Sequence, residues 1–102
     1  MKLTTLIIAS MTLTSLAVAA NARDLGPDEA LKLRDSGSIQ AFEKLNETAL
    51  AKHPGGVIRE TELENKLGRY LYQLEVVDAQ GVEWDLELDA ATGEVLKDHQ
   101  DD

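Results

Sequence analysis

The sequence predicts an α+β domain in which a helical segment of two helices packs on one face of an antiparallel sheet of three to four strands. Apolar residues recur at helical spacing between Ile39 and Leu50, which indicates an amphipathic helix. From Val57 the period changes to two, as in strands with one buried face. Glycine-containing segments between these stretches indicate turns. Helices that precede a run of strands are typical of the α+β class.

The first 22 residues are predicted to be a signal peptide outside the fold. Lys2 provides a positive start and an apolar stretch follows. Two sites then fit cleavage, Ala17-Val18-Ala19 and Ala20-Asn21-Ala22, and we favour cleavage after Ala22 because it leaves a charged start at Arg23. Thr and Ser residues interrupt the apolar stretch, which disfavours a membrane-spanning helix, and a retained anchor is the alternative. The chain has no Cys that could carry a lipid. We therefore expect an exported protein with no membrane insertion after cleavage.

Residues 23–98 are expected to form one small domain, and residues 99–102 a disordered acidic tail. Because the chain has no Cys, packing alone must stabilise this domain. The formal charge of the chain is −9, and removal of Lys2 with the leader makes it −10. This charge repels nucleic acid and anionic lipid and favours cations or a basic protein surface. The alternative is an acidity that serves solubility alone.

The two helices have recognisable ends. Gly26 and Pro27 fit the start of a first helix that runs to about Asp35, and Gly37 suits the left-handed conformation that ends it. Ser38 is expected to cap the second helix, and the Pro54-Gly55-Gly56 segment after His53 ends it, because the residue before a proline disfavours helix. The apolar stripe of the second helix is Ile39, Phe42, Leu45, Ala49 and Leu50.

Three strands follow, each with two distinct faces, and a short fourth is expected from Glu94 to Lys97. In the first strand, one face carries Val57, Arg59, Thr61 and Leu63, and the other carries Ile58, Glu60, Glu62 and Glu64. The second strand directs inward Tyr70, Tyr72, Leu74 and Val76. The third directs inward Val82, Trp84, Leu86 and Leu88, and directs outward Glu83, Asp85, Glu87 and Asp89.

The loop Ala79-Gln80-Gly81 predicts the register of the hairpin between the second and third strands. Val76 should lie opposite Trp84, and Leu74 opposite Leu86, on the buried face. Glu75 should then lie opposite Asp85 on the wet face. Opposed like charges destabilise a strand pair, so this face favours a partner or cation that relieves the repulsion.

The acidic residues are not arranged for chemistry. Alternation with apolar residues places the carboxylates in a row along a strand, where they cannot wrap around one calcium ion as in an EF-hand. Asp85 and Glu87 lack the burial that shifts the pKa of catalytic carboxyls. His53 ends a helix and His99 falls in the tail, so no zinc pair is formed. We expect no catalytic residues, no metal site and no cofactor.

The segment from Leu63 through Gly68, Tyr72 and Gly81 to Asp89-Ala90-Ala91-Thr92-Gly93-Glu94-Val95-Leu96 resembles a PepSY domain. The helical part upstream is similar to that of small bacterial periplasmic members with one such domain. One departure is Gln73, where the family often has Glu. The resemblance implies occurrence in protease propeptides and cell-envelope proteins, a role in restraining peptidases or in signalling by protein contact, and a periplasmic location. It implies no catalytic residue, and it implies structural turns at Gly68, Gly81, Asp89, Thr92 and Gly93.

These observations predict a non-enzymatic periplasmic binding or regulatory module whose partner is a protein, either a protease or a sensor ectodomain. The alternative is an envelope protein that binds a cation or small ligand, with weak divalent cation binding at the same acids. Six residues form the expected protein-contact face: Glu60, Glu62, Glu75, Glu83, Asp85 and Glu87.

Overall fold

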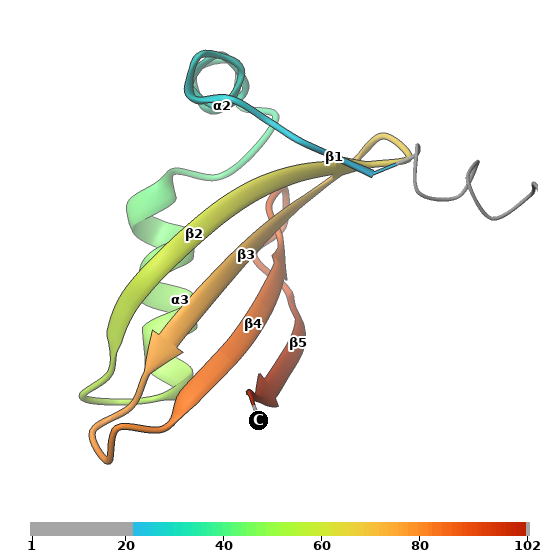
Figure 1. Cartoon of the computed structure of the whole chain (residues 1–102). Helices are drawn as coiled ribbons and strands as arrows, with labels where there is room; N and C mark the ends of the chain where they lie inside the picture. The colour runs from blue at the N-terminus through green and yellow to red at the C-terminus, as the bar shows by residue number, and fades with distance from the viewer. Residues whose placement is uncertain (1–21, 102) are drawn as a thin grey trace, which may run out of the picture.

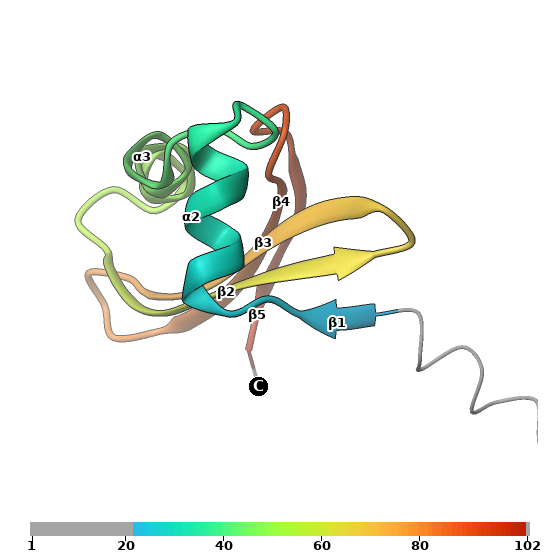
Figure 2. The same cartoon turned by 90° about the horizontal axis from the view of Figure 1, so that it is seen from above.

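The structure is a computed structural model that describes residues 22–101. It contains, in chain order, a short strand, two helices and four strands (Figures 1 and 2). The α+β class is therefore confirmed. The predicted signal peptide, residues 1–22, lies outside the described residues except for Ala22. Within residues 22–101, neither helix is long and apolar enough to span a membrane.

The sheet is antiparallel throughout and has five strands, where three to four were predicted. The strands lie side by side in chain order: β1 (Ala22–Asp24), β2 (Val57–Lys66), β3 (Arg69–Val77), β4 (Glu83–Asp89) and β5 (Val95–Gln100). The strand that the sequence analysis missed is β1, which pairs only with the end of β2, at Glu64–Lys66. Three residues are too few to display a period of two, which explains the omission.

The first helix, α2 (Pro27–Asp35), agrees with the prediction, with Gly26 at its N-cap and Gly37 at a φ of 80° after it. The second helix, α3 (Phe42–Lys52), begins later than predicted. Its N-cap is Ala41 and not Ser38, because the backbone N–H of Gln40 donates to the carbonyl of Ala90 and ties this segment to the sheet. In Figure 1, α3 lies against one face of the sheet and α2 lies near β1.

The core lies between α3 and the inward face of β2, β3 and β4. Leu45 and Ala49 from α3 are fully buried there. Alternate residues of β3 and β4 meet them, which is the pattern predicted from the period of two. The buried residues that these two strands contribute to this core are Tyr72, Leu74, Val76, Leu86 and Leu88.

The predicted register of the β3–β4 hairpin is confirmed. Val76 pairs with Trp84, Leu74 with Leu86, and Glu75 with Asp85. Gly81 has a φ of 84° in the loop, a conformation that residues with a Cβ rarely adopt.

A β-bulge in β2 corrects the faces predicted for the start of that strand. The pairing with β3 shifts between Ile58 and Glu60, so Arg59 is the additional residue. Ile58 therefore packs against the core, and Val57 is 64% exposed, the reverse of the prediction. Arg59 contacts residues of the outward face and not the core. Beyond the bulge, the faces agree with the prediction.

The last strand, β5, extends two residues into the segment expected to be a disordered tail. His99 and Gln100 pair with Asp85 and Trp84, and the backbone N–H of Asp101 donates to the carbonyl of Glu83. This end of the chain is held because β4 offers backbone partners along its full length, and acidic composition alone does not prevent strand pairing.

Candidate functional site

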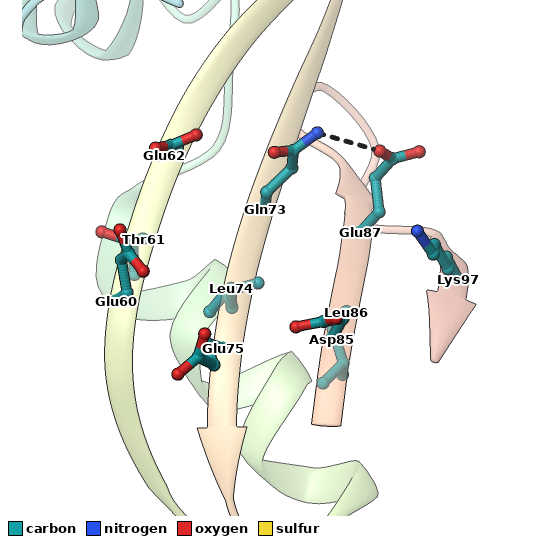
Figure 3. A pocket seen from close by; sticks show the side chains of 10 residues that line it. All are labelled: Glu60, Thr61, Glu62, Gln73, Leu74, Glu75, Asp85, Leu86, Glu87 and Lys97. Atoms are coloured by element: carbon teal, nitrogen blue, oxygen red, sulfur yellow. Dashed lines mark hydrogen bonds between the residues drawn. The ribbon is translucent and has the colours of Figure 1, made fainter. Parts of the chain in front are cut away.

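The outward face of the sheet carries the acidic residues, on the side opposite the core. Alternation along β3 and β4 directs these side chains outward, because the residues between them are buried. Figure 3 shows them around a groove of about 290 Å³ that crosses the sheet from β2 to β5. Charged and amide side chains of four strands line it: Glu60, Glu62, Gln73, Glu75, Asp85, Glu87 and Lys97. The structure thus brings five of the six predicted contact residues to one groove, and Glu83 follows beside it on β4.

Strand register arranges these side chains in two rows across the sheet. The carboxylate row is Glu60, Glu75 and Asp85, with His99 of β5 at its end. The mixed row is Glu62, Gln73, Glu87 and Lys97.

The two rows differ in how their charges are compensated. In the mixed row, the side-chain amide of Gln73 donates a hydrogen bond to Glu87 at 3.2 Å (Figure 3), and Lys97 lies opposite Glu87. In the carboxylate row, three acids are neighbours on adjacent strands. Such neighbours repel each other, so a positive partner would stabilise the carboxylate row.

The bulge residue Arg59 provides part of that positive charge from within the chain. Its Nε lies 3.5 Å from Oε1 of Glu75, and its guanidinium also forms an ion pair with Glu83. Sequence analysis placed Arg59 on the buried face, and no feature of the sequence marks the bulge that turns it outward. Arg59 compensates one end of the face, while Glu60 and Asp85 form no ion pair within residues 22–101.

Three carboxylates meet at the same end of the face, which bears on the predicted weak cation binding. Glu75, Glu83 and Asp101 each place one oxygen within 4.8 Å of the others. Oxygen ligands of this kind suit calcium or magnesium. However, Arg59 already binds two of the three, so a cation would have to displace or share this guanidinium.

Negative charge is also concentrated where β1 ends on β2. The pKa of Glu62 is raised, first by the charge of Asp24 and then by partial burial and the charges of Glu60 and Glu64. A raised carboxyl pKa means that the ionised form is unfavourable there. A positive group near Glu62 would relieve this repulsion.

The predicted turn residues have structural roles. Oδ1 of Asp89 accepts the backbone N–H groups of Ala91 and Thr92, and its Oδ2 accepts from Arg69 at 3.2 Å. Partial burial raises the pKa of Asp89, but these hydrogen bonds outweigh it and the net pKa is lowered. Gly93 has a φ of 82°, and a Cβ there would lie 2.8 Å from the side-chain oxygen of Gln40.

The β2–β3 hairpin has the tightest of these turns. Its two loop residues, Leu67 and Gly68, both have positive φ, and Oδ1 of Asn65 accepts the N–H of Gly68. This conformation is that of a two-residue hairpin turn, in which glycine is favoured.

One cluster on the inward side was missed by sequence analysis. Nε2 of His53, at the end of α3, lies 2.8 Å from Oδ1 of Asp98, and its ring lies 4.4 Å from that of Trp84. The indole N–H of Trp84 donates to Asp78, which also caps the β3–β4 loop. The sequence pattern predicted only that His53 ends a helix, and it did not predict these contacts. Extending β5 past Lys97 would have placed Asp98 opposite Leu86, on the inward side near that helix.

A comparison with protein-family models identifies the family of this chain. Residues 40–99 match the family model described as "Peptidase propeptide and YPEB domain", abbreviated PepSY. The chain is also similar to "Uncharacterized protein YkoJ" of Bacillus subtilis (strain 168), with 37% identity over 60 residues. That match covers 59% of this chain and 35% of the relative, so the chain spans about a third of the relative's length. No solved structure gives a significant match.

Proposed function

Because the chain belongs to the PepSY family, as the match over residues 40–99 shows, we propose that it is a non-enzymatic regulatory module that binds a protein through its outward sheet face. The partner is a peptidase that it restrains or the outer domain of an envelope sensor that it modulates. The family description, which refers to peptidase propeptides, supports the first of these. The features of the first 22 residues support export to the periplasm.

The carboxylate row is the observation that carries this proposal. Glu60, Glu75 and Asp85 are neighbours on three strands whose opposite face packs in the core. Their positions are therefore set by a rigid sheet, and a partner meets a preformed surface. Repulsion within the row is relieved when a basic surface covers it.

The groove suits a protein surface better than a small molecule. Its lining is drawn from four strands and is mainly charged, whereas pockets for small ligands are mostly apolar with few polar groups. Complementary charge of this kind gives specificity and fast association between proteins. The partner is thus expected to present Lys or Arg side chains to the sheet.

A binding role also accounts for the carboxyl groups without catalysis. Asp89 is held by two backbone N–H groups and Arg69, which leaves it a structural residue. Asp85 and Glu87 point into an open groove from one strand face. General acid and base work needs two carboxyls held in different environments, whereas Asp85 and Glu87 lie on the same strand face and line the same open groove.

The proposal is tested by charge reversal with a matched control. The tagged protein is used to capture partners from a periplasmic extract of the source organism, next to an Asp85→Lys, Glu87→Lys variant. The control is Glu43→Lys, Glu47→Lys, which makes the same change in charge at exposed positions of α3, on the opposite side of the sheet. We expect the same partner to be retained by the protein and the control and lost by the face variant.

Circular dichroism must show that both variants remain folded. A partner that binds the face variant with full affinity would show that the groove is not the contact surface. Loss with both variants would show that net charge, and not this face, determines binding.

A second candidate function, binding of a divalent cation, is favoured by the cluster of Glu75, Glu83 and Asp101. It predicts that calcium or magnesium at sub-millimolar concentration raises the melting temperature saturably. Asp101→Asn should remove this shift, because it removes the ligand that Arg59 does not bind. An unchanged melting temperature would exclude this function.

A further inference from the structure

Most of β2 is an open edge of the sheet. Its only partner on the outer side is β1, which ends at Asp24, and the last hydrogen bond on this side runs from the N–H of Leu25 to the carbonyl of Leu63. In an antiparallel strand the backbone groups of every second residue point to the same side, so those of Thr61 also point outward. Within residues 22–101, no strand pairs with this side of β2 from residue 57 to 62. Figures 1 and 2 show β1 short and β2 continuing past it.

An apolar groove of about 570 Å³ follows this edge on the inward side. Leu25, Phe42, Leu63 and Tyr72 contribute to its lining, and the edge residue Thr61 borders it. The groove therefore offers apolar contact to side chains that point inward from a strand placed beside β2.

Negative charge lies along the same edge. Asp24 and Glu62 border the apolar groove, and Glu60 and Glu62 also line the acidic groove on the outward side. The repulsion that raises the pKa of Glu62 comes first from Asp24, across this edge. The only basic residue in this part of β2, Arg59, is bound by Glu75 and Glu83.

We propose that β2 accepts an extended basic peptide as an additional antiparallel strand, paired with Ile58–Glu62 beyond the end of β1. This proposal rests on the proposed function, because it specifies how the protein partner reaches the acidic face. An open strand that adds an extended peptide obtains affinity from backbone hydrogen bonds and specificity from alternate side chains. The occupant lies beyond Leu25, beside the start of α2 at Pro27, and its backbone pairs with the outward-pointing groups of Thr61.

The two grooves specify the pattern of the peptide. Side chains of an added strand alternate between the faces, so one set meets the apolar groove and the other meets Glu60 and Glu62. A peptide of alternating apolar and basic residues therefore suits the apolar groove on one face and the two carboxylates on the other. In this orientation the inward residue opposite Thr61 directs its own N–H and C=O toward β2, because directly opposed residues that exchange hydrogen bonds point to the same face.

A second copy of this chain does not fit the edge. Pairing β2 with another β2 would bring two sets of Glu60 and Glu62 together, and like charges on adjacent strands destabilise the pair. Charged edge residues are a common means of preventing such self-association. The same charges attract a basic strand, which separates the proposed occupant from a homodimer.

The first test uses three synthetic hexapeptides of alternating Lys and Val, with binding to the full-length protein measured by fluorescence anisotropy. One is unmodified, one is N-methylated at every Val and one at every Lys. Only the valine N–H groups face β2 in the proposed orientation. We expect roughly tenfold or greater loss of affinity with methylated valine and little change with methylated lysine, because only the former removes strand hydrogen bonds. Equal affinities of the three peptides, loss with methylated lysine alone, or no binding of the unmodified peptide would overturn the proposal.

The second test changes the protein at Thr61. Thr61→Pro removes the outward N–H without removing a hydrogen bond to β3, and proline is tolerated on edge strands. Thr61→Val keeps the N–H and the branched shape. We expect Thr61→Pro to weaken the unmodified peptide by roughly tenfold and Thr61→Val by less than about twofold.

The outcomes separate this inference from the proposed function. If Asp85→Lys, Glu87→Lys abolishes partner binding while Thr61→Pro and valine methylation change nothing, the acidic face binds without strand addition and this inference fails alone. If Thr61→Pro weakens the peptide while the face variant keeps its natural partner, the proposed function fails and the edge remains a peptide site.

Discussion

The two faces of this sheet share one backbone but differ in what they require of their residues. On the inward face, Leu74, Val76, Leu86 and Leu88 are at most 3% exposed and close-packed with α3. On the outward face, neighbouring strands place Glu60, Glu75 and Asp85 side by side. The inward face provides the stability that allows the outward face to hold repelling charges in fixed positions. The difference shows that the two faces are separable by mutation, and the predictions below test that separation.

The largest effect is expected on the inward face. Leu88→Ala should lower the free energy of unfolding by about 2 to 5 kcal/mol, because Leu88 is fully buried and its removal leaves a cavity. Leu96→Ala is the control, since Leu96 is 36% exposed. This change should alter the free energy of unfolding by less than about 1 kcal/mol. Urea denaturation of both variants measures the difference. Similar losses would mean that Leu88 is not more tightly packed than Leu96.

The bulge in β2 predicts a smaller contrast between adjacent residues. Ile58→Ala should lower the free energy of unfolding by about 1 to 2 kcal/mol, since Ile58 is partly buried against the core, while Val57→Ala should change it by less than about 0.5 kcal/mol. Simple alternation from Val57 onward predicts the opposite order. Urea denaturation of the two variants therefore tests the position of the bulge directly.

A fall in pH should lower the stability contributed by a turn and raise the stability contributed by the outward face. The pKa of Asp78 is lowered, first by the hydrogen bond from Trp84 and then by that from the backbone of Val82. The contribution of Asp78 to folding stability is therefore lost as pH falls through this lowered pKa. The pKa of Glu62 is raised, chiefly by Asp24, so stability from this site increases as pH falls through the raised value.

Urea midpoints measured from about pH 7 to about pH 3 for Asp78→Asn and Glu62→Gln separate the two contributions. Asp78→Asn should flatten the loss of stability in acid. Glu62→Gln should be more stable than the parent near neutrality and lose that advantage in acid. The same pH profile for both variants and the parent would contradict the two assignments.

The smallest effect is expected in the mixed row. Gln73→Glu places a carboxylate between Glu62 and Glu87 and removes the amide that donates to Glu87, so it should lower the free energy of unfolding by about 0.5 kcal/mol. Gln73→Lys, with opposite charge, should be neutral or stabilising. Thermal melts at low and high salt test this, because salt screens exposed charges. A loss that persists in high salt would indicate a packing effect.

The inward face could be predicted closely from the sequence. Apolar residues at every second position from Tyr70 to Leu88, with one glycine loop between them, determine which residues face α3 and which pairs oppose each other. The same regularity placed Glu75 opposite Asp85, and with it the centre of the acidic face.

The remaining features depend on tertiary contacts that local patterns do not contain. An inserted residue such as Arg59 leaves no trace in composition. It nevertheless places Val57 and Ile58 each on the face opposite to the one predicted. Ser38 has the side chain of a helix cap, but attachment of Gln40 to Ala90 delays the helix to Phe42. The open edge of β2 was not predictable either, because it depends on where β1 ends.

The order of the strands has a kinetic consequence. From β2 to β5 each strand pairs with its successor in the chain, and the hairpin loops between them are short. Contacts between residues close in sequence need little loop closure, and proteins rich in them fold quickly. We therefore expect these four strands to assemble early as successive hairpins. The pairing of β1 with β2 joins residues on either side of both helices, so it should form late and be the first contact to open in the native protein.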